Sequence, residues 1–225
     1  MSVGMSAGMR VMVTGAAGYI GSVVARDLAA QGHDVLGVDF RPMPQIENSR
    51  VLDLNDAQAI DAAVAEVDAV CHLAWPMGQW READVSDASD LGAGVRGLFH
   101  LLTSCVRHRV KRFVFQSTIN ITGPSWDSWR ITEDEVPRPG IDGYTLGKTL
   151  AEDLCRSFSR AHDITIAAIR VGGVFTFEAE GHGGGPDVHY LPSSCVERRD
   201  IAQAHGQSLT KDLPSRFEVF HIFHD

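Results

Sequence analysis

The chain lacks the features that mark membrane, secreted and nucleic-acid-binding proteins. Its 225 residues contain no apolar run of about eighteen residues, which argues against a membrane-spanning helix. Only nine residues precede the first predicted strand, which leaves no room for a signal peptide. The formal net charge is −9, and this acidic balance argues against a nucleic-acid surface. We therefore expect a cytoplasmic protein with neither a membrane nor a nucleic acid as partner.

Cysteine is scarce, and its placement argues against disulfides and metal sites. The four cysteines are Cys71, Cys105, Cys155 and Cys195. They lie in separate predicted elements without pairwise metal spacing, so buried, reduced thiols are expected. His182 and His189 lie near one another, but no further ligands with a recognisable spacing accompany them, and no metal site is predicted.

The start of the chain has the pattern of a strand, a glycine turn and a helix. The apolar run 11–13 predicts a buried parallel strand, and an alanine-rich helical pattern covers 23–30. Between them, Gly15 permits a sharp turn, Gly18 lets backbone approach a phosphate, and Gly21 lets the helix pack on the strand. The N–H groups at the helix start attract an anion. The pattern predicts a pyrophosphate site, with an ordinary glycine-rich turn as the alternative.

An acidic residue follows at the distance that a dinucleotide site requires. Asp39 ends the apolar run 35–38, about twenty residues after the turn, where an acid holds the adenosine ribose hydroxyls. Its charge would repel the 2′-phosphate of NADP, so NAD is favoured and NADP is less favoured. Arg41 is close enough to support the opposite preference.

Helix and strand patterns alternate along the rest of the chain, which predicts an α/β fold with a doubly wound parallel sheet. Asn55 and Asp200 are the predicted N-caps of the second and last helices, and Gly32 ends the first. The predicted helices span 19–31, 56–65, 91–108, 144–162 and 201–211. After the first strand, the predicted strands span 34–39, 50–54, 69–74, 112–118, 164–171 and 216–222.

A tyrosine and a lysine open the predicted helix 144–162. Tyr144 and Lys148 are four residues apart and share one helix face. A free tyrosine has a pKa of about 10, too high for a base near neutral pH. A close ammonium and a cationic nicotinamide would both stabilise the phenolate. Chance matches to this spacing are common, as is a Ser-Thr pair at a strand end such as Ser117-Thr118.

Taken together, these motifs resemble the extended short-chain dehydrogenase/reductase family, the NAD-dependent epimerases and dehydratases. The resemblance rests on the segment Thr14-Gly-Ala-Ala-Gly-Tyr-Ile-Gly21, on Ser117-Thr118 and on Tyr144-x-x-x-Lys148, and it extends over 9–222. It implies a Rossmann-type sheet, an NAD(P) cofactor and a catalytic set of Tyr144, Lys148 and Thr118. Ser117 is the neighbouring possibility for holding the substrate oxygen. The layout is closer to the short uronate dehydrogenases than to the longer nucleotide-sugar enzymes.

The resemblance also implies a set of cofactor contacts. Asp53 matches an aspartate against the adenine, with a solvated turn acid as the alternative, and 73–75 matches backbone laid along the cofactor. His72 is expected to be a core histidine. The implied cofactor contacts are Gly15, Ala17, Gly18, Tyr19, Ile20, Asp39, Arg41, Asp53, Leu54, Leu73, Ala74, Trp75, Tyr144 and Lys148.

Two glycines depart from the family pattern. Gly94 stands where an asparagine of the catalytic relay is usual, which puts that relay in doubt. Gly173 stands where nucleotide-sugar members have an asparagine, so a diphosphate ligand is less well supported. The implied substrate contacts are Ser117, Thr118, Arg170 and Gly173.

We expect a tail at 1–8 and a single Rossmann-type domain at 9–225. A loop or lid at 176–194 lies within a reduced substrate-binding region formed by 172–198 and the C-terminal segment. Trp126 and Trp129 either line the substrate site or pack on the surface.

Three functions are consistent with these features. The first is an NAD-dependent oxidoreductase acting on a hydroxyl or carbonyl of a sugar, sugar acid or similar small polyol. The second is a nucleotide-sugar epimerase or dehydratase that recycles its NAD. The third is a non-catalytic NAD-binding regulator. For the enzyme, the resemblance implies a homodimer that pairs through helices 91–108 and 144–162.

Overall fold

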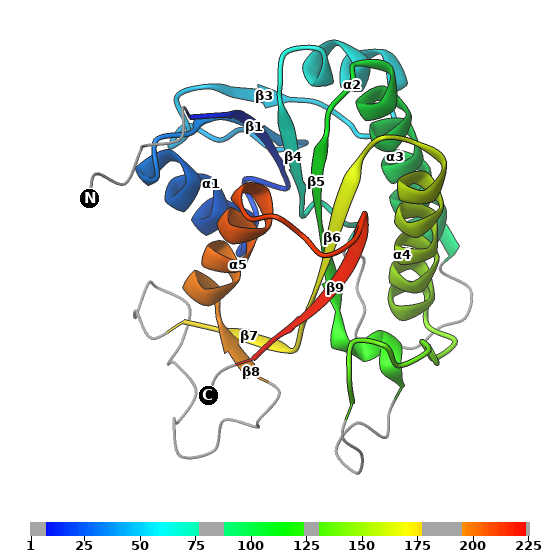
Figure 1. Cartoon of the computed structure of the whole chain (residues 1–225). Coiled ribbons are helices and arrows are strands. Elements are labelled where there is room, and N and C mark those ends of the chain that lie inside the picture. The colour runs from blue at the N-terminus through cyan, green and yellow to red at the C-terminus, as the bar shows by residue number, and fades with distance from the viewer. Residues whose placement is uncertain (1–7, 77–87, 124–130, 177–194, 224–225) are drawn as a thin grey trace.

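The computed structural model describes residues 8–76, 88–123, 131–176 and 195–223. Seven parallel strands form one sheet in the order β3-β2-β1-β4-β5-β6-β9 (Figure 1). The strands are β1 (Arg10–Thr14), β2 (Asp34–Asp39), β3 (Ser49–Val51), β4 (Ala69–His72), β5 (Arg112–Thr118), β6 (Thr165–Val171) and β9 (Phe217–Ile222). The strand order reverses between β1 and β4, and the predicted doubly wound α/β fold is confirmed.

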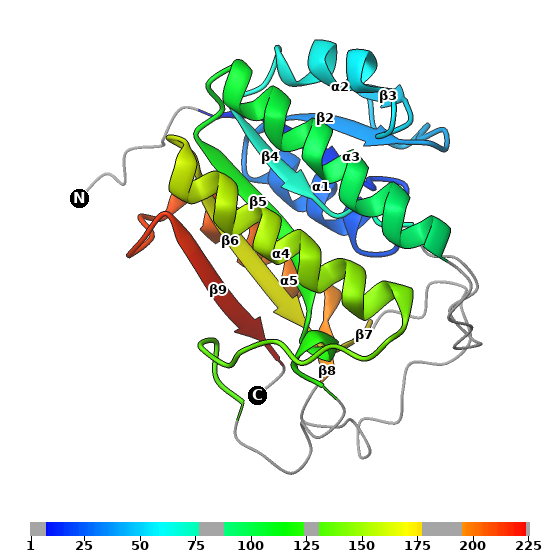
Figure 2. The same cartoon turned by 90° about the vertical axis from the view of Figure 1, so that its right-hand side faces the viewer.

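Helices cover both faces of this sheet. One face is covered by α1 (Gly21–Ala30) and α5 (Arg198–Thr210), which pack on one another. The other is covered by α2 (Ala57–Val64), α3 (Ala88–Arg107) and α4 (Gly143–Ala161), and Figure 2 shows α3 and α4 lying side by side across it. Side chains alternate between these faces along each strand. In β5, for example, Phe113 and Phe115 pack in the core beneath α3 and α4, whereas Val114 packs in the core beneath α1 and α5.

The structure corrects several expected boundaries. Asp56, not Asn55, caps α2, because its carboxylate accepts hydrogen bonds from the amides of Gln58 and Ala59. At α5 the cap is Glu197, whose side chain accepts from the amide of Arg199, while Asp200 lies in the first helical turn. The third strand is shorter than predicted and ends at Val51.

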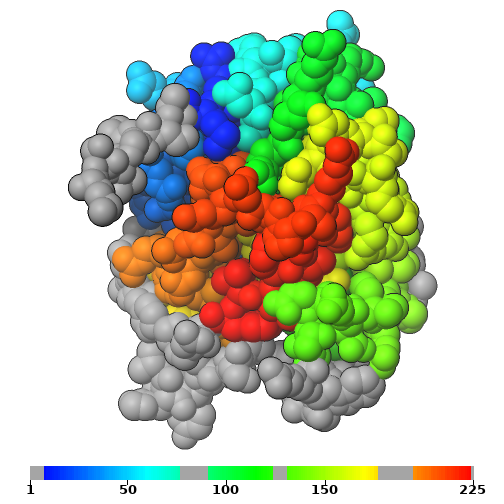
Figure 3. Space-filling model, viewed as in Figure 1, coloured from blue at the N-terminus to red at the C-terminus, as the bar shows by residue number. Residues whose placement is uncertain are grey.

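A second, two-stranded parallel sheet was not predicted. It consists of β7 (Gly173–Phe175) and β8 (Cys195–Glu197), each of three residues. Figure 3 shows α5 and β9 together on one face of the molecule. The C-terminal strand β9 pairs with β6 and contacts α5, the last helix.

Two further features of the described residues bear on the earlier expectations. Cys71, Cys105 and Cys155 are buried free thiols, as predicted, whereas Cys195 is partly exposed. Among the described helices, none is both long and apolar enough to cross a membrane. Trp126, Trp129, His182 and His189 lie outside the described residues.

Candidate active site

The glycine turn joins the end of β1 to α1. Gly15 has a φ of +72°, in the left-handed region that favours glycine, and the Gly18 amide donates to its carbonyl at 2.8 Å. A Cβ on Gly21 would lie 2.1 Å from the Gly15 carbonyl oxygen. The helix therefore starts directly against the turn. Ile20 occupies the N-cap position without a side-chain hydrogen bond, so no side chain competes with an anion there.

Asp39 links the end of β2 to this turn. Its Oδ2 accepts from the amide of Ala17 at 3.0 Å, and its Oδ1 accepts from the amide of Arg41 at 3.0 Å. The Arg41 guanidinium forms an ion pair with Asp39 at 3.4 Å and is half exposed. A carboxylate has about four lone-pair sites, and these three contacts leave about one for a ribose hydroxyl. Tyr19, beside the turn, has the Arg198 guanidinium over its ring at 4.9 Å.

The segment after β4 lies on the other side of the strand reversal. A Cβ on Gly15 would lie 2.7 Å from the Ala74 amide nitrogen, and that amide donates to Thr14 Oγ1. Leu73 donates its amide to the Thr14 carbonyl at 3.2 Å. The structure thus brings 73–75 against the glycine turn at the carboxyl edge of the sheet, where ligands of such sheets bind.

His72 is a core histidine, as expected. His72 is 1% exposed, and its Nδ1 lies 2.7 Å from Thr14 Oγ1. Burial lowers the pKa of His72 to about 3, so the ring is neutral near physiological pH.

Asp53 and Leu54 follow β3 at the sheet edge. Asp53 accepts hydrogen bonds from the amide and side chain of Asn55, which lower the pKa of its carboxyl group. Leu54 packs against α3, where a Cβ on Gly97 would lie 3.1 Å from the Cβ of Leu54.

Thr118 and Tyr144 meet at the end of β5. Thr118 is buried. Its hydroxyl accepts a hydrogen bond from the amide of Asn120, and Thr118 thereby caps the short helix η1 (Ile119–Thr122). Its side chain lies beside Tyr144, in the first turn of α4, and lowers the pKa of the phenol. Burial raises the pKa of Tyr144, Thr118 opposes this rise, and the charge of Asp142 raises the pKa further. This direction is opposite to the one expected from the sequence for the cofactor complex.

Lys148 lies one helical turn after Tyr144 and is almost fully buried. Its Nζ donates to the Gln116 carbonyl at 2.7 Å and lies over the rings of Trp75 and Phe115, 4.4 Å and 4.9 Å from their centroids. Burial lowers the pKa of Lys148 to about 7. The structure thus brings all three predicted catalytic residues to the end of β5.

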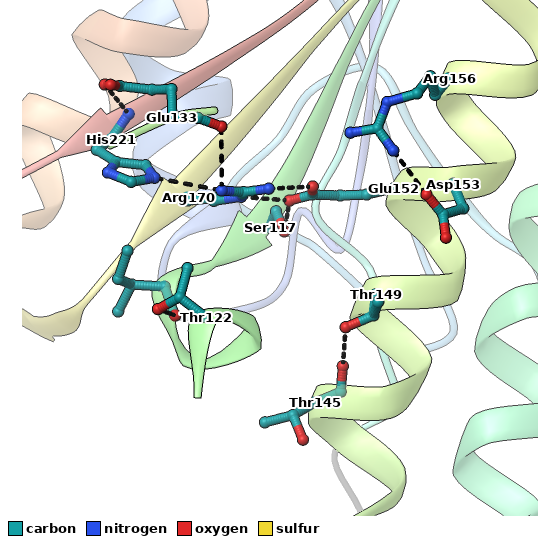
Figure 4. Close-up of polar contacts among 11 residues, drawn as sticks. Ser117, Thr122, Glu133, Thr145, Thr149, Glu152, Asp153, Arg156, Arg170 and His221 are labelled. Atoms are coloured by element: carbon teal, nitrogen blue, oxygen red, sulfur yellow. Dashed lines mark hydrogen bonds and ion pairs between the residues drawn. The ribbon is translucent and has the colours of Figure 1, made fainter. Parts of the chain in front are cut away.

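Ser117 and Arg170 belong to a buried polar network rather than to an open surface. Arg170 donates from Nε and Nη2 to the two carboxylate oxygens of Glu152, at 3.0 and 2.8 Å, and both side chains are 1% exposed (Figure 4). Ser117 Oγ donates to Glu152 at 2.5 Å. These contacts give both residues a structural role, and their contact with a substrate stays a prediction.

The network reaches from α4 across β6 to β9. Figure 4 shows Arg170 between Glu152 on one side and Glu133 and His221 on the other. Arg170 Nη1 lies 3.5 Å from the Glu133 carbonyl and 3.4 Å from His221 Nε2. Sequence reasoning missed Glu152, because its partners Arg170 and Ser117 lie 18 and 35 residues away in the sequence and no local pattern links them.

Gly173 lies in the small second sheet. It is exposed at the start of β7, and a Cβ added there would lie 3.1 Å from the sulfur of Cys195. No group of three potential metal ligands occurs among the described residues.

The residues around the glycine turn fit a dinucleotide. A side chain on any of the three glycines of the turn would collide with backbone, and Asp39 accepts a hydrogen bond from the Ala17 amide within the turn. The Thr118–Tyr144 pair and Lys148 follow along the same edge of the sheet.

Known proteins are similar to this chain in both sequence and fold. Uronate dehydrogenase of Pseudomonas syringae pv. tomato is 31% identical over 170 residues, which cover 74% of this chain and 60% of that protein. 2-Alkyl-3-oxoalkanoate reductase of Stenotrophomonas maltophilia is 32% identical over 167 residues, 71% of this chain and 49% of that protein. The chain thus spans about half to three-fifths of the length of these curated relatives.

Solved structures agree with this similarity. A mutated uronate dehydrogenase superimposes with a TM-score of 0.79 at 27% identity, covering 95% of this chain and 74% of that one. UDP-glucose 4-epimerase of Thermus thermophilus, in complex with NAD, has the same fold, with a TM-score of 0.80 at 24% identity and coverage of 96% and 78%. A model of the NAD dependent epimerase/dehydratase family matches residues 11–193. This chain therefore belongs to the NAD dependent epimerase/dehydratase family, the extended short-chain dehydrogenases/reductases.

Proposed function

We propose that the protein is an NAD-dependent oxidoreductase that acts on a hydroxyl or carbonyl of a sugar, sugar acid or similar small polyol. One observation carries the proposal: Thr118 and Tyr144 come together at the end of β5, with Lys148 one turn along α4, on the same sheet edge as the glycine turn. A binding module has no need of this arrangement, whereas a proton-transfer enzyme does.

In this proposal, Tyr144 exchanges a proton with the substrate oxygen. Burial raises the pKa of its phenol, so in the reductive direction Tyr144 is protonated and can donate. In the oxidative direction the same group must accept the proton, and a nearby cation would favour the phenolate. Thr118 and Tyr144 hold the same substrate oxygen, and the Lys148 ammonium supplies the local positive charge.

The dinucleotide supplies the hydride acceptor when it is bound. Gly15, Gly18 and the amides at the start of α1 would hold the pyrophosphate, and Asp39 would hold the adenosine ribose. Because Asp39 carries a negative charge beside that ribose, we propose a preference for NAD over NADP.

A sugar acid is the substrate class that the relatives favour. Two uronate dehydrogenases from Pseudomonas species match the chain at 31% and 28% identity. The glycine at position 173, where nucleotide-sugar members have an asparagine, argues against a diphosphate-linked sugar. We propose that the exposed start of β7, with β8 and β9, contributes the substrate-binding region.

We also propose a homodimer that pairs through α3 and α4. Phe99 on α3 and Leu150 on α4 are 49% and 44% exposed, and large exposed apolar side chains on adjacent helices fit an interaction face. Light scattering of wild type and of a Phe99→Glu, Leu150→Glu variant tests this, with a dimer expected only for wild type.

The Tyr144→Phe variant tests the proposed chemistry. It removes only the phenolic oxygen, so turnover should fall by roughly 10²- to 10⁴-fold while NAD binding stays unchanged. Full turnover in this variant would contradict the proposal.

A further inference from the structure

The indole of Trp75 lies in a notch between two helices. A Cβ on Gly94 of α3 would lie 2.9 Å from Cη2 and Cζ2 of Trp75, and a Cβ on Gly147 of α4 would lie 2.8 Å from Cζ2. Real Cβ atoms essentially never approach other atoms so closely. Gly92, two residues earlier on α3, has open space around it. The notch therefore requires glycine at positions 94 and 147 in particular.

Carbon atoms hold the ring in this notch. Within the part of the chain that the structure describes, Nε1 of Trp75 is buried without a hydrogen-bond partner. The ring packs edge-on against Phe115, with centroids 6.5 Å apart at 63°.

The same ring faces the buried ammonium. Lys148 Nζ lies 4.4 Å from the Trp75 centroid and 4.9 Å from that of Phe115, within the range of a cation–π contact. Among the described residues, it forms no ion pair with a carboxylate, and its hydrogen bond goes to the Gln116 carbonyl. Two ring faces and one carbonyl thus take the place of water around a residue that is 3% exposed.

We propose that Trp75 is the positioning residue for Lys148. Its indole, seated in the Gly94–Gly147 notch, holds the Lys148 side chain by a cation–π contact. The ring lies where the family has the asparagine of its proton relay. The proposal rests on the role given to Lys148 in the proposed function. It explains the glycine at position 94, because any side chain there would collide with the indole. It also means that no side chain at position 94 takes part in a proton relay, because Trp75 ring carbons fill the space that such a side chain would need.

The proposal is tested by titrating Lys148 itself. The chain has three lysines, Lys111, Lys148 and Lys211, so ¹³C-labelled lysine gives three side-chain resonances, and a Lys148→Arg variant assigns one of them. Trp75→Phe keeps an aromatic face, whereas Trp75→Leu fills the notch without one. Loss of the contact should lower the Lys148 pKa in the Leu variant by about one unit relative to the Phe variant. A pKa in the Leu variant equal to or above that of the Phe variant would overturn the proposal.

A glycine pair gives a matched control. Gly94→Ala places a methyl group against the indole and should change the Lys148 pKa, whereas Gly92→Ala should leave both the pKa and turnover unchanged. A Gly94→Ala variant that titrates like wild type would also overturn the proposal, even if the Trp75 variants do not fold.

These titrations need no turnover, so the two proposals fail separately. If no substrate is turned over, the proposed function fails while the Lys148 pKa still reports on Trp75. If turnover requires Tyr144 but the Lys148 pKa does not depend on Trp75, only the positioning role fails.

Discussion

The carboxylate of Asp39 accepts a hydrogen bond from the amide of Ala17, with 3.0 Å between Oδ2 and N. This contact joins the carboxyl end of β2 to the glycine turn. The residue proposed to select the cofactor therefore also stabilises the turn that would bind it, and a substitution must separate the two roles.

Asp39→Asn and Asp39→Ser separate them. Asparagine keeps an acceptor for Ala17 but removes the charge, so discrimination against NADP should relax by roughly tenfold. Serine removes the bidentate acceptor as well, so NAD binding itself should weaken by roughly ten- to a hundredfold. Titration of both cofactors against each variant measures these changes. Wild-type protein that binds NADP as tightly as NAD would contradict the role of Asp39.

The buried Glu152–Arg170 pair should dominate the stability of its region. Glu152→Gln leaves the guanidinium of Arg170 without a charged partner in the interior, and such losses cost about 3–5 kcal/mol. The free energy of unfolding from urea denaturation measures the effect. The nearby exposed pair Asp153–Arg156 is the control, and Asp153→Asn should cost less than about 1 kcal/mol.

Replacing both Glu152 and Arg170 tests whether the loss of stability comes from the unpaired buried charge. A Glu152→Leu, Arg170→Met variant removes both charges and should recover much of the stability that Glu152→Gln loses. If Glu152→Gln and Asp153→Asn lower the free energy of unfolding equally, the buried pair contributes no more to stability than the exposed pair.

Two buried histidines should make the fold sensitive to acid. Burial lowers the pKa of His72 to about 3 and that of His205 to about 4, below the value of about 6.5 for an unfolded chain. Between these values the unfolded state binds more protons, so stability falls as pH falls. Each histidine contributes at most about 1.4 kcal/mol per pH unit.

Urea denaturation between about pH 7 and pH 4 measures this slope. His72→Asn and His205→Asn should each make it shallower, whereas His162→Asn should not, because His162 is exposed. Equal slopes in all three variants would exclude the two buried rings as the cause.

The sequence predicted the parts of the fold that local patterns encode. Apolar runs and glycine spacing identified β1, the turn at Gly15 and α1, and the spacing of Tyr144 and Lys148 placed both on one helix face. These signals are local because strand burial, turn geometry and helical period are each set by residues close in sequence.

Contacts between distant segments were not predictable in this way. Trp75 fills a space shared by α3 and α4, and nothing near position 75 indicates those glycines. Likewise, no local pattern around Arg170 indicates that Glu152 on α4 pairs with it in the interior. The β7–β8 sheet pairs three-residue strands that are too short for a periodic signal.

Net oxidation or reduction with NAD is proposed to depend on Tyr144. The most direct measurement is NADH absorbance while wild-type protein is mixed with NAD and a panel of uronic acids, neutral sugars and small polyols. We expect steady accumulation of NADH with at least one sugar acid, and its loss by roughly 10²-fold or more in Tyr144→Phe. Epimerised or dehydrated product without NADH accumulation, or turnover that survives Tyr144→Phe, would exclude net oxidation or reduction by Tyr144.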